Sequence, residues 1–452
     1  STLQRILFIF MLANLLSGCG ATASLWGDLP TPTANPKTPA YATPIIAPLV
    51  PSITPSLTPT PQVTLPAPAT VTATVTATPT SAEEPDEPTP TLPPVNASGP
   101  MFVYKSQSGD TLEIVAKRFE VSLTGIVAEV NLPPAGNLIK PGTLLLIPNR
   151  LNDQTTPGEQ SLPDSEFVYS PSTIGFDAAE YVGNAQGYLS TYKESLSSDE
   201  ITGIAAVERI ALENSLNPRM VLAIIEYESN WVLGQPTNLA QDEYPLGHVD
   251  YHKKGLFRQL MWASGMLSDG YYRWRSGDLT ELHFKDGTKL RLNPTLNAGT
   301  AAVQYYFSLE HSRAEWEQAV APTGFAALSK DMFGDPWERA RMVEPLLPAG
   351  LSQPELSLPF QPRKVWSFSG GPHSVWEEEG ALAALDFAPS AEITGCVKSD
   401  LWILAPAAGT VVRTAKGVVM LDLDGDGNEQ TGWVLLFLHV QQTSSVKTGA
   451  VL

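Results

Sequence analysis

The sequence predicts a multidomain α+β protein with a long disordered linker, and three observations lead to that expectation. The chain has 452 residues, which exceeds one ordinary domain. Residues up to about 100 include a long tract rich in proline and threonine, a composition that cannot bury a core and favours extended conformations. Beyond this linker, the hydrophobic pattern changes from helical spacing in residues 172–350 to strand-like alternation in residues 356–452. We therefore expect several folded units behind a tether.

Charge and cysteine content narrow the classes of function. The chain has 47 acidic and 28 basic residues, for a net charge of −19. Binding to nucleic acid requires basic patches that neutralise phosphates, so we expect no nucleic-acid partner. Only two cysteines occur, Cys19 and Cys396, and no disulfide framework is predicted.

The N-terminal region is typical of an exported protein. An apolar run over residues 6–16 follows the lone Arg5 and is too short to span a bilayer. The run ends in LSGC, whose last residue is Cys19, and this motif resembles the lipobox of bacterial lipoproteins. The resemblance implies a signal peptide over residues 1–18, acylation of Cys19, and a linker over 19–100 that anchors the protein to the outer side of a bacterial membrane, in the cell envelope. The alternative is a cysteine that follows a hydrophobic segment by chance.

Residues 101–149 have a short strand pattern at each end and helical spacing between. They resemble the LysM module, a βααβ glycan-binding fold, through the segments SGDTL (108–112), IKPG (139–142) and LIP (146–148). The resemblance implies that two strand–helix loops bind N-acetylglucosamine polymers. The residues that it assigns to glycan binding are Gly109, Asp110, Thr111, Asn131, Ile139, Pro141 and Gly142. For Asp110 the alternative is N-capping of the helix that follows.

A connector over residues 150–171 precedes the helical region, which contains NPRMVLAIIEYESNW at 217–231. Proline after asparagine favours a helix start at Asn217. The buried stripe of this helix, at spacings of three and four residues, includes Glu228. Glu226 lies about 200° away around the helix axis, and we expect it to be solvated.

This helix resembles the catalytic helix of the lysozyme-like lytic transglycosylases, in which a Glu-Ser pair closes an apolar helix. Residues 255–260 (GLFRQL) are similar to the family's Gly-Leu-Met-Gln motif, and residues 296–303 (LNAGTAAV) to a segment beside its glycan cleft. The chain departs from the family at Ala302, where a tyrosine is usual, and Tyr305 or Tyr306 is the candidate replacement.

The resemblance implies that Glu228 is the general acid and base of glycan cleavage. A carboxyl on an apolar stripe has a raised pKa and can donate a proton near neutrality. No second carboxylate is fixed by a motif, which favours transglycosylation over hydrolysis. The alternative is a buried glutamate paired with an arginine such as Arg258. The aromatic residues Tyr271, Tyr272 and Trp274 either stack on sugars or belong to the core.

Residues 356–452 resemble the lysostaphin/LytM-type zinc endopeptidases, which cut the peptide cross-links of peptidoglycan. Asp386 matches the aspartate of the family's His-x-x-x-Asp motif, but Leu382 stands where the histidine belongs, so His373 is the candidate histidine ligand. His439 matches a histidine that stabilises the reacting carbonyl. The family's final His-x-His pair lies further along the chain, and we expect it, and zinc binding, in a longer protein. The alternatives are a degenerate domain, a turn histidine for His373 and a buried strand-end histidine for His439.

Two further histidine and aspartate patterns carry weaker signals. DLDGDGN at 422–428 imitates the start of a calcium loop, but Trp433 stands where such a loop has glutamate, and a hairpin turn is the alternative. His248, His252, His283 and His311 have no ligand spacing and receive no role.

Together these patterns predict a lipoprotein that binds and remodels peptidoglycan, cleaving glycan strands through Glu228 and peptides through zinc. The competing interpretations are a non-enzymatic wall-binding tether, or an activator of a cell-wall amidase with a degenerate LytM-type domain.

Overall fold

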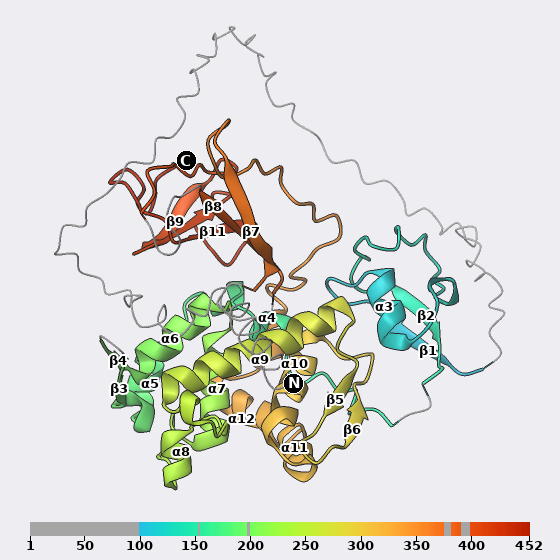
Figure 1. The fold of residues 1–452 in the computed structure, drawn as a ribbon. Helices are drawn as coiled ribbons and strands as arrows, with labels where there is room; N and C mark the ends of the chain where they lie inside the picture. The colour runs from blue at the N-terminus through green and yellow to red at the C-terminus, as the bar shows by residue number, and fades with distance from the viewer. Residues whose placement is uncertain (1–98, 152–153, 197–198, 375–380, 390–397) are drawn as a thin grey trace, which may run out of the picture.

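The computed structural model describes residues 99–151, 154–196, 199–374, 381–389 and 398–452. Figure 1 shows three groups of elements in chain order, namely a small unit near the N-terminal end of this part, a helical unit, and a unit of β-strands. The predictions on the signal peptide, on Cys19, on Cys396 and on nearly all of the linker concern residues outside the described ranges.

The first unit is a two-stranded antiparallel sheet with one helix packed on it. Strand β1 (Met101–Lys105) pairs with β2 (Leu144–Pro148), and helix α3 (Leu112–Phe119) lies between them in the chain. Where the LysM resemblance implies a second α-helix, the structure has a single 3₁₀ turn, η1 (Leu123–Gly125). Val127 instead forms an antiparallel bridge to Leu146, a geometry that suits a β-branched residue.

The second unit is mainly helical and holds the largest core. Its longest helix, α9 (Leu256–Ser276), packs against α6 (Gly203–Glu213) and α10 (Ala298–Glu310). Helix α7 (Pro218–Ser229) packs against α6 and α12 (Phe325–Phe333). The remaining helices are α4 (Asp164–Phe167), α5 (Ala178–Ala185), α8 (Leu239–Glu243), α11 (Arg313–Ala319), α13 (Pro336–Ala340) and the 3₁₀ turns η2 (Pro171–Thr173), η3 (Tyr188–Ser190) and η4 (Tyr251–Lys253).

Two hairpins interrupt these helices. Strand β3 (Lys193–Ser195) pairs with β4 (Glu200–Thr202), and β5 (Glu281–His283) pairs with β6 (Lys289–Arg291). The second hairpin turns at Asp286-Gly287, a residue pair typical of such turns, and Gly287 has a φ of 82°.

A capping box between Ser312 and Glu315 separates α10 from α11. The hydroxyl of Ser312 accepts from the Glu315 N–H, and the Glu315 carboxylate accepts from the Ser312 N–H. One continuous helical pattern in the sequence is therefore two helices, and the break places His311 at the end of α10.

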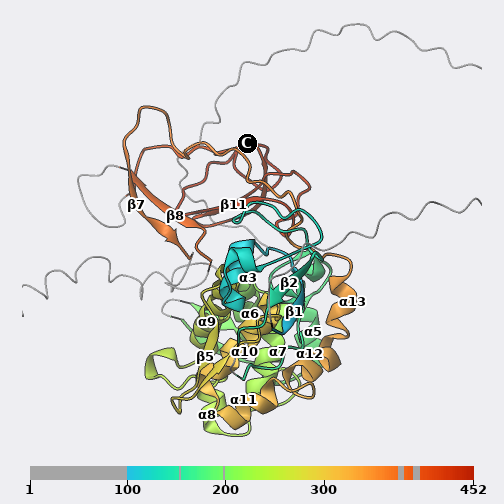
Figure 2. The same ribbon diagram turned by 90° about the vertical axis from the view of Figure 1, so that its right-hand side faces the viewer.

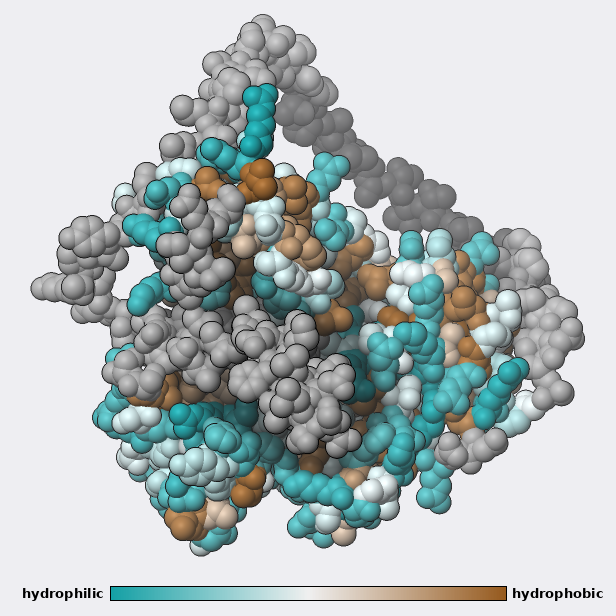
Figure 3. All heavy atoms as spheres, in the orientation of Figure 1, coloured by the Kyte–Doolittle hydropathy of each residue, from teal (hydrophilic) through white to brown (hydrophobic). Residues whose placement is uncertain are grey.

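The third unit contains two antiparallel sheets. Strand β7 (Trp366–His373) pairs with β8 (Ala384–Pro389), and β10 (Val418–Asp422) lies between β9 (Thr410–Ala415) and β11 (Val434–Leu438). Figure 2 shows this unit on the opposite side of the molecule from α8 and α11. Phe368 on β7 and Leu385 on β8 are exposed hydrophobic residues, as is Leu382 shortly before β8. Figure 3 shows hydrophobic surface on the part of the molecule that holds these strands.

Among the described residues, no helix has the length and apolarity needed to cross a membrane.

Candidate active sites

Helix α7 carries the two glutamates that the sequence analysis distinguished. Asn217 caps its first turn by accepting from the Arg219 N–H at 2.9 Å, and Pro218 occupies the first helical position. The helix ends at Asn230, which adopts the left-handed conformation with a φ of 59°. The predicted start and end of this helix are therefore confirmed.

The expectation that Glu226 is solvated is wrong. Glu226 is 8% exposed, and its Oε2 accepts hydrogen bonds from the backbone N–H groups of Val232 and Leu233 at 2.9 and 2.8 Å. After the left-handed residue Asn230 the chain folds back along the helix, and the Glu226 carboxylate satisfies two amides of that returning segment. Glu226 therefore has a structural part that its position on the helical wheel does not reveal.

Glu228 is nearly enclosed, and its side chain is 9% exposed. The pKa of its carboxyl is raised from 4.5 to about 8, chiefly by burial and in smaller part by the negative charges of Glu310 and Glu315. Its Oε2 lies 3.5 Å from Nε2 of His311. Burial lowers the pKa of His311, so at neutral pH this contact joins a protonated carboxyl and a neutral imidazole rather than two ions.

One tyrosine of α10 lies within electrostatic reach of the Glu228 carboxyl. The buried hydroxyl of Tyr306 has no hydrogen-bond partner within the described residues, and the charge of Glu228 contributes to raising its pKa. Tyr305 faces elsewhere, since its hydroxyl donates to Asp269 at 3.0 Å. Of the two candidates to replace the tyrosine missing at Ala302, Tyr306 is therefore the one on the Glu228 side.

A loop held by Gln259 covers the same carboxyl. The side-chain amide of Gln259 donates to the carbonyls of His248 and Lys253 at 2.8 Å each, and its oxygen accepts from the Leu246 N–H. A Cβ on Gly247 would lie 3.8 Å from Oε2 of Glu228, so this loop passes directly over the carboxyl. The buried glutamine of the GLFRQL segment thus positions the loop next to Glu228.

Histidines to which the sequence analysis gave no role lie around this site. His248 Nδ1 is 2.7 Å from Oε1 of Glu310, and its ring stacks on Trp262 with 4.2 Å between centroids. His311 contacts Glu228 directly. Glu310 also pairs with Lys285 of the β5–β6 hairpin. Glu228, His248, Lys285 and the adjacent pair Glu310-His311 come from distant parts of the sequence, and no local spacing could have connected them.

The other candidate partners of Glu228 lie elsewhere. The Arg258 charge acts on Glu194, and no ion pair joins Arg258 to Glu228 among the described residues, so the alternative of an Arg258–Glu228 pair is wrong. Tyr271 and Trp274 are 3% and 2% exposed and belong to the core, which leaves only Tyr272 partly accessible.

In the first unit, Asp110 is a buried structural residue. It accepts from the Tyr104 hydroxyl at 2.6 Å and from the Gln107 N–H at 2.8 Å, and it pairs with the buried Arg118. The expected N-cap at Asp110 is wrong by one residue, because Thr111 caps α3 by accepting from the Ile114 N–H. Asp110 therefore acts on the loop conformation rather than on a ligand at the surface.

The other residues assigned to glycan binding differ in their exposure. Ile139 is 1% exposed and belongs to the core, whereas Asn131 and Gly142 are exposed and Pro141 is half-buried. Gly109 lies against the helical unit, since a Cβ there would overlap the guanidinium of Arg275.

The loop before α3 is docked on the helical unit through several contacts. Arg275 donates to the Ser108 carbonyl at 3.3 Å, and the Leu347 N–H donates to the Ser108 hydroxyl at 2.8 Å. Gln107 donates to the Thr295 carbonyl at 2.8 Å. The two units are thus joined at the loop that the resemblance assigns to glycan binding.

In the third unit, the β7–β8 pair brings the two predicted metal ligands together. His373 Nε2 and Asp386 Oδ2 are 3.0 Å apart, although thirteen positions separate them in the chain. His373 Nδ1 lies 2.6 Å from the Ser374 carbonyl, and this contact together with Asp386 raises the pKa of His373. An Nδ1–H bond to a carbonyl leaves Nε2 as the free ligand atom, which is the usual arrangement of a metal-binding histidine.

Among the described residues, no hydrogen bond or ion pair joins the other predicted features of this unit to that pair. His439 follows β11, is exposed and has a φ of 58°, so the alternative of a buried strand-end histidine is wrong. The loop at 422–428 joins β10 to β11 as a hairpin. It gathers the carboxylates of Asp422, Asp424 and Asp426 within 4.8 Å of one another. The Asp422 carboxylate already accepts from the N–H groups of Asp424 and Gly427, which accounts for its burial.

Zinc fits the His373–Asp386 pair by ligand type and by the fixed orientation of the imidazole. A catalytic zinc site takes three protein ligands. The His373–Asp386 pair would supply two of these three.

Comparison with known proteins adds one relationship. Residues 160–347 match the family described as LasA, N-terminal domain. LasA is a staphylolytic LytM-type peptidase, and LytM-type peptidases are generally zinc-dependent. No curated protein and no solved structure matches the chain. The match covers most of the helical unit and supports a peptidase-related function at the cell wall.

Proposed function

We propose that this protein acts on peptidoglycan as a LytM-type zinc endopeptidase, with His373 and Asp386 as two of its metal ligands. The observation that carries the proposal is the 3.0 Å approach of His373 Nε2 to Asp386 Oδ2 on adjacent strands. The match of residues 160–347 to the N-terminal domain of a LytM-type peptidase supports the same function.

The roles of the residues follow from their geometry. Ser374 orients the His373 ring through its carbonyl, and Asp386 supplies a carboxylate oxygen from the facing strand. Zinc bound there would polarise a peptide carbonyl and lower the pKa of a water molecule. The exposed side chains of Phe368 and Leu385 on the same strands offer an apolar surface to a peptide beside the ligands.

Zinc titration of the full chain by calorimetry tests this assignment. His373→Ala and Asp386→Asn should each remove the zinc-binding heat. His283→Ala is a matched control, because His283 is exposed and pairs with a glutamate in the helical unit. Zinc binding that is unchanged in His373→Ala would contradict the proposal.

A second function, glycan cleavage through Glu228, is favoured by a different observation. Its carboxyl carries a proton near neutrality, is nearly buried, and lies within electrostatic reach of Tyr306, whose hydroxyl has no hydrogen-bond partner among the described residues. A proton-bearing carboxyl is what cleavage of a glycosidic bond requires at the leaving oxygen. Glu228 would donate that proton to the leaving oxygen as the glycosidic bond breaks. Its carboxylate would then take up the proton of the sugar's own 6-hydroxyl, whose oxygen bonds to the anomeric carbon.

Peptidoglycan digestion followed by mass spectrometry tests this second function. Anhydro-muropeptides should form with the parent and with Glu200→Gln, an exposed control, but not with Glu228→Gln. Anhydro products from Glu228→Gln would show that another group is the acid. Absence of anhydro products from the parent would leave Glu228 without a part in glycan cleavage.

Attachment to the wall and to the membrane completes the proposal. The exposed residues Asn131 and Gly142 and the half-buried Pro141 of the LysM-like unit are the proposed glycan contacts, and Cys19 is the proposed lipid anchor of an exported protein. Mass analysis of the mature N-terminus tests the anchor, and an unmodified Cys19 would contradict it. If the protein binds the wall but neither binds zinc nor cleaves glycan, its remaining function is that of a wall-binding tether or of an activator of a cell-wall amidase.

A further inference from the structure

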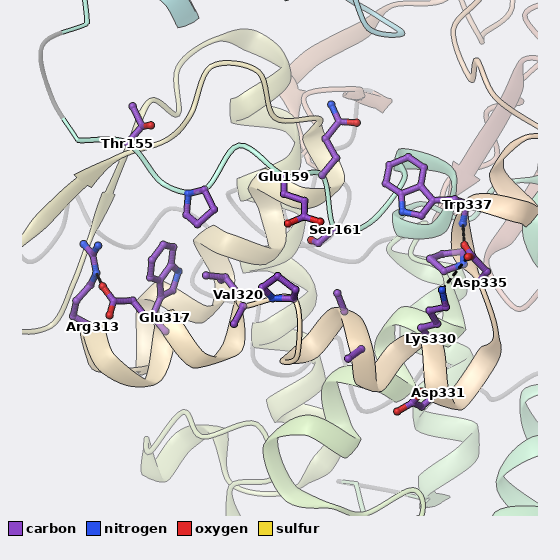
Figure 4. Close-up of a pocket in the computed structure, with 18 residues that line it drawn as sticks. Thr155, Glu159, Ser161, Arg313, Glu317, Val320, Lys330, Asp331, Asp335 and Trp337 are labelled. Carbon is purple, nitrogen blue, oxygen red and sulfur yellow. Dashed lines mark hydrogen bonds and ion pairs between the residues drawn. The ribbon is translucent and has the colours of Figure 1, made fainter.

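A groove of about 790 Å³ lies in the helical unit, between helices α11, α12 and α13 and the segment 155–161. A volume of this size is typical of ligand sites. Neither Glu228 nor His373 lines it, so it is separate from both candidate active sites. Figure 4 shows the segment with Thr155, Glu159 and Ser161 on one side and the helices with Arg313, Val320 and Lys330 on the other.

The segment that carries Glu159 is fixed at both ends. The Thr156 N–H donates to the Arg291 carbonyl at 2.8 Å, and the Ser161 N–H donates to the Thr300 hydroxyl at 2.9 Å. Between these anchors, Glu159 projects toward α11 and α12 in Figure 4. The backbone on either side therefore fixes the position of Glu159 at the edge of the groove, and its side chain is exposed.

The groove has an excess of negative charge. Four carboxylates line it, those of Glu159, Glu317, Asp331 and Asp335, against the two cations Arg313 and Lys330. Both cations are already paired, Arg313 with Glu317 at 2.9 Å and Lys330 with Asp335 at 3.1 Å. Within the described residues, the Glu159 carboxylate has no hydrogen-bond or ion-pair partner. A ligand with a positively charged group could therefore form an ion pair with the Glu159 carboxylate.

The walls of the groove suit the aliphatic part of such a ligand. Pro157, Pro322, Pro336 and the half-buried Trp337 present apolar surface on both sides. The stem of an amine side chain can lie along such surface while its ammonium reaches a carboxylate. An uncharged glycan would find only one accessible aromatic ring, since Trp316 is 1% exposed.

We infer that this groove binds the stem peptide of peptidoglycan through the free side-chain amine of its diamino acid, with Glu159 as the carboxylate that receives the ammonium. The inference rests on the proposed action on peptidoglycan. A stem peptide held in the groove gives the protein a second attachment to the polymer whose cross-links are its proposed substrate, and two linked attachments raise the effective affinity.

Calorimetry with the full chain tests the inference. The probe is Nα-acetyl-L-Ala-D-isoglutaminyl-L-Lys amide, whose only charge is the lysine ammonium, and the matched probe has that amine acetylated. The parent should prefer the free amine by about fivefold, as one solvated ion pair allows, and the preference should fall with added salt. Glu159→Gln should remove the preference. Glu338→Gln should keep it, since Glu338 is an exposed acid of α13 outside the groove.

Equal affinity for the two probes, absence of binding, or an equal effect of Glu159→Gln and Glu338→Gln would each overturn the inference. Zinc titration of the same samples separates this failure from failure of the proposed function. Zinc binding that depends on His373, together with no preference for the amine, would leave the endopeptidase proposal standing and reject the groove.

Discussion

Glu228→Gln should stabilise the helical unit in a way that depends on pH. The pKa of Glu228 rises from 4.5 to about 8 on folding, chiefly because the carboxyl is buried. A carboxyl with a raised folded-state pKa lowers stability as pH rises, beginning at the unfolded value and ending at the folded value. Since one pKa unit corresponds to about 1.4 kcal/mol, the loss between pH 4 and pH 7 is about 3 kcal/mol. Glutamine keeps the size of the side chain but cannot ionise, so the variant escapes this loss.

Thermal unfolding followed by far-UV circular dichroism measures this effect, because the described helices lie almost wholly in one unit. A difference of about 3 kcal/mol corresponds to roughly 10 °C in Tm for a unit of this size. Glu228→Gln and the parent should have similar Tm values at pH 4 and diverge by that amount near pH 7, whereas Glu200→Gln should follow the parent throughout. Parallel pH profiles for Glu228→Gln and the parent would refute the reasoning, since Glu228 would then ionise equally well in both states.

Three further predictions concern the other units. Asp110→Ala leaves Arg118 buried without its partner, so the LysM-like unit should lose about 3 to 5 kcal/mol in chemical unfolding; a loss under 1 kcal/mol would show that water replaces the carboxylate. The pKa of His373 is raised, so protons compete with zinc for this side chain at a higher pH than they do for a free histidine. As the pH is lowered from 8, the zinc affinity should therefore begin to fall before pH 6.5 is reached. A constant affinity from pH 8 to pH 6 would contradict the assigned ligand. Arg275→Ala removes a contact between the helical unit and Ser108, so amide hydrogen exchange in residues 106–110 should become faster. Arg341→Ala, at an exposed position, is the control and should leave the exchange rate unchanged. Equal exchange rates in the two variants would contradict the docking of this loop.

Local patterns in the sequence predicted the helices and strands that carry the candidate sites. Asn217 and Pro218 start α7 as expected, and Val221, Ile224 and Ile225 of the predicted stripe are buried, although residues on the other faces of α7 are buried as well. The turn at Asp286-Gly287 likewise depends on adjacent residues.

Features that depend on a segment folding back against a helix could not be predicted from local patterns. Glu226 is buried because the segment after Asn230 folds back to donate two N–H groups, which the helical wheel does not contain. The N-cap of α3 fell one residue from its expected place because Asp110 is engaged by Tyr104 and Arg118, leaving Thr111 to cap the helix.

Long-range contacts account for the remaining differences. His248 and His311 reach the Glu228 site through packing between elements distant in the chain, and the groove around Glu159 is assembled from four separate segments. The His373–Asp386 pair was predicted as a ligand pair from a family resemblance, and the strand pairing of β7 with β8 provides its physical basis.

The most direct test of the central claim is the zinc-dependent release of new amino groups from cross-linked peptidoglycan by the complete protein. With zinc present, the parent should release amines, and both a chelator and His373→Ala should abolish the release. Amine release that persists in His373→Ala or in the chelator, or no release from a parent that binds zinc through His373, would contradict the endopeptidase account.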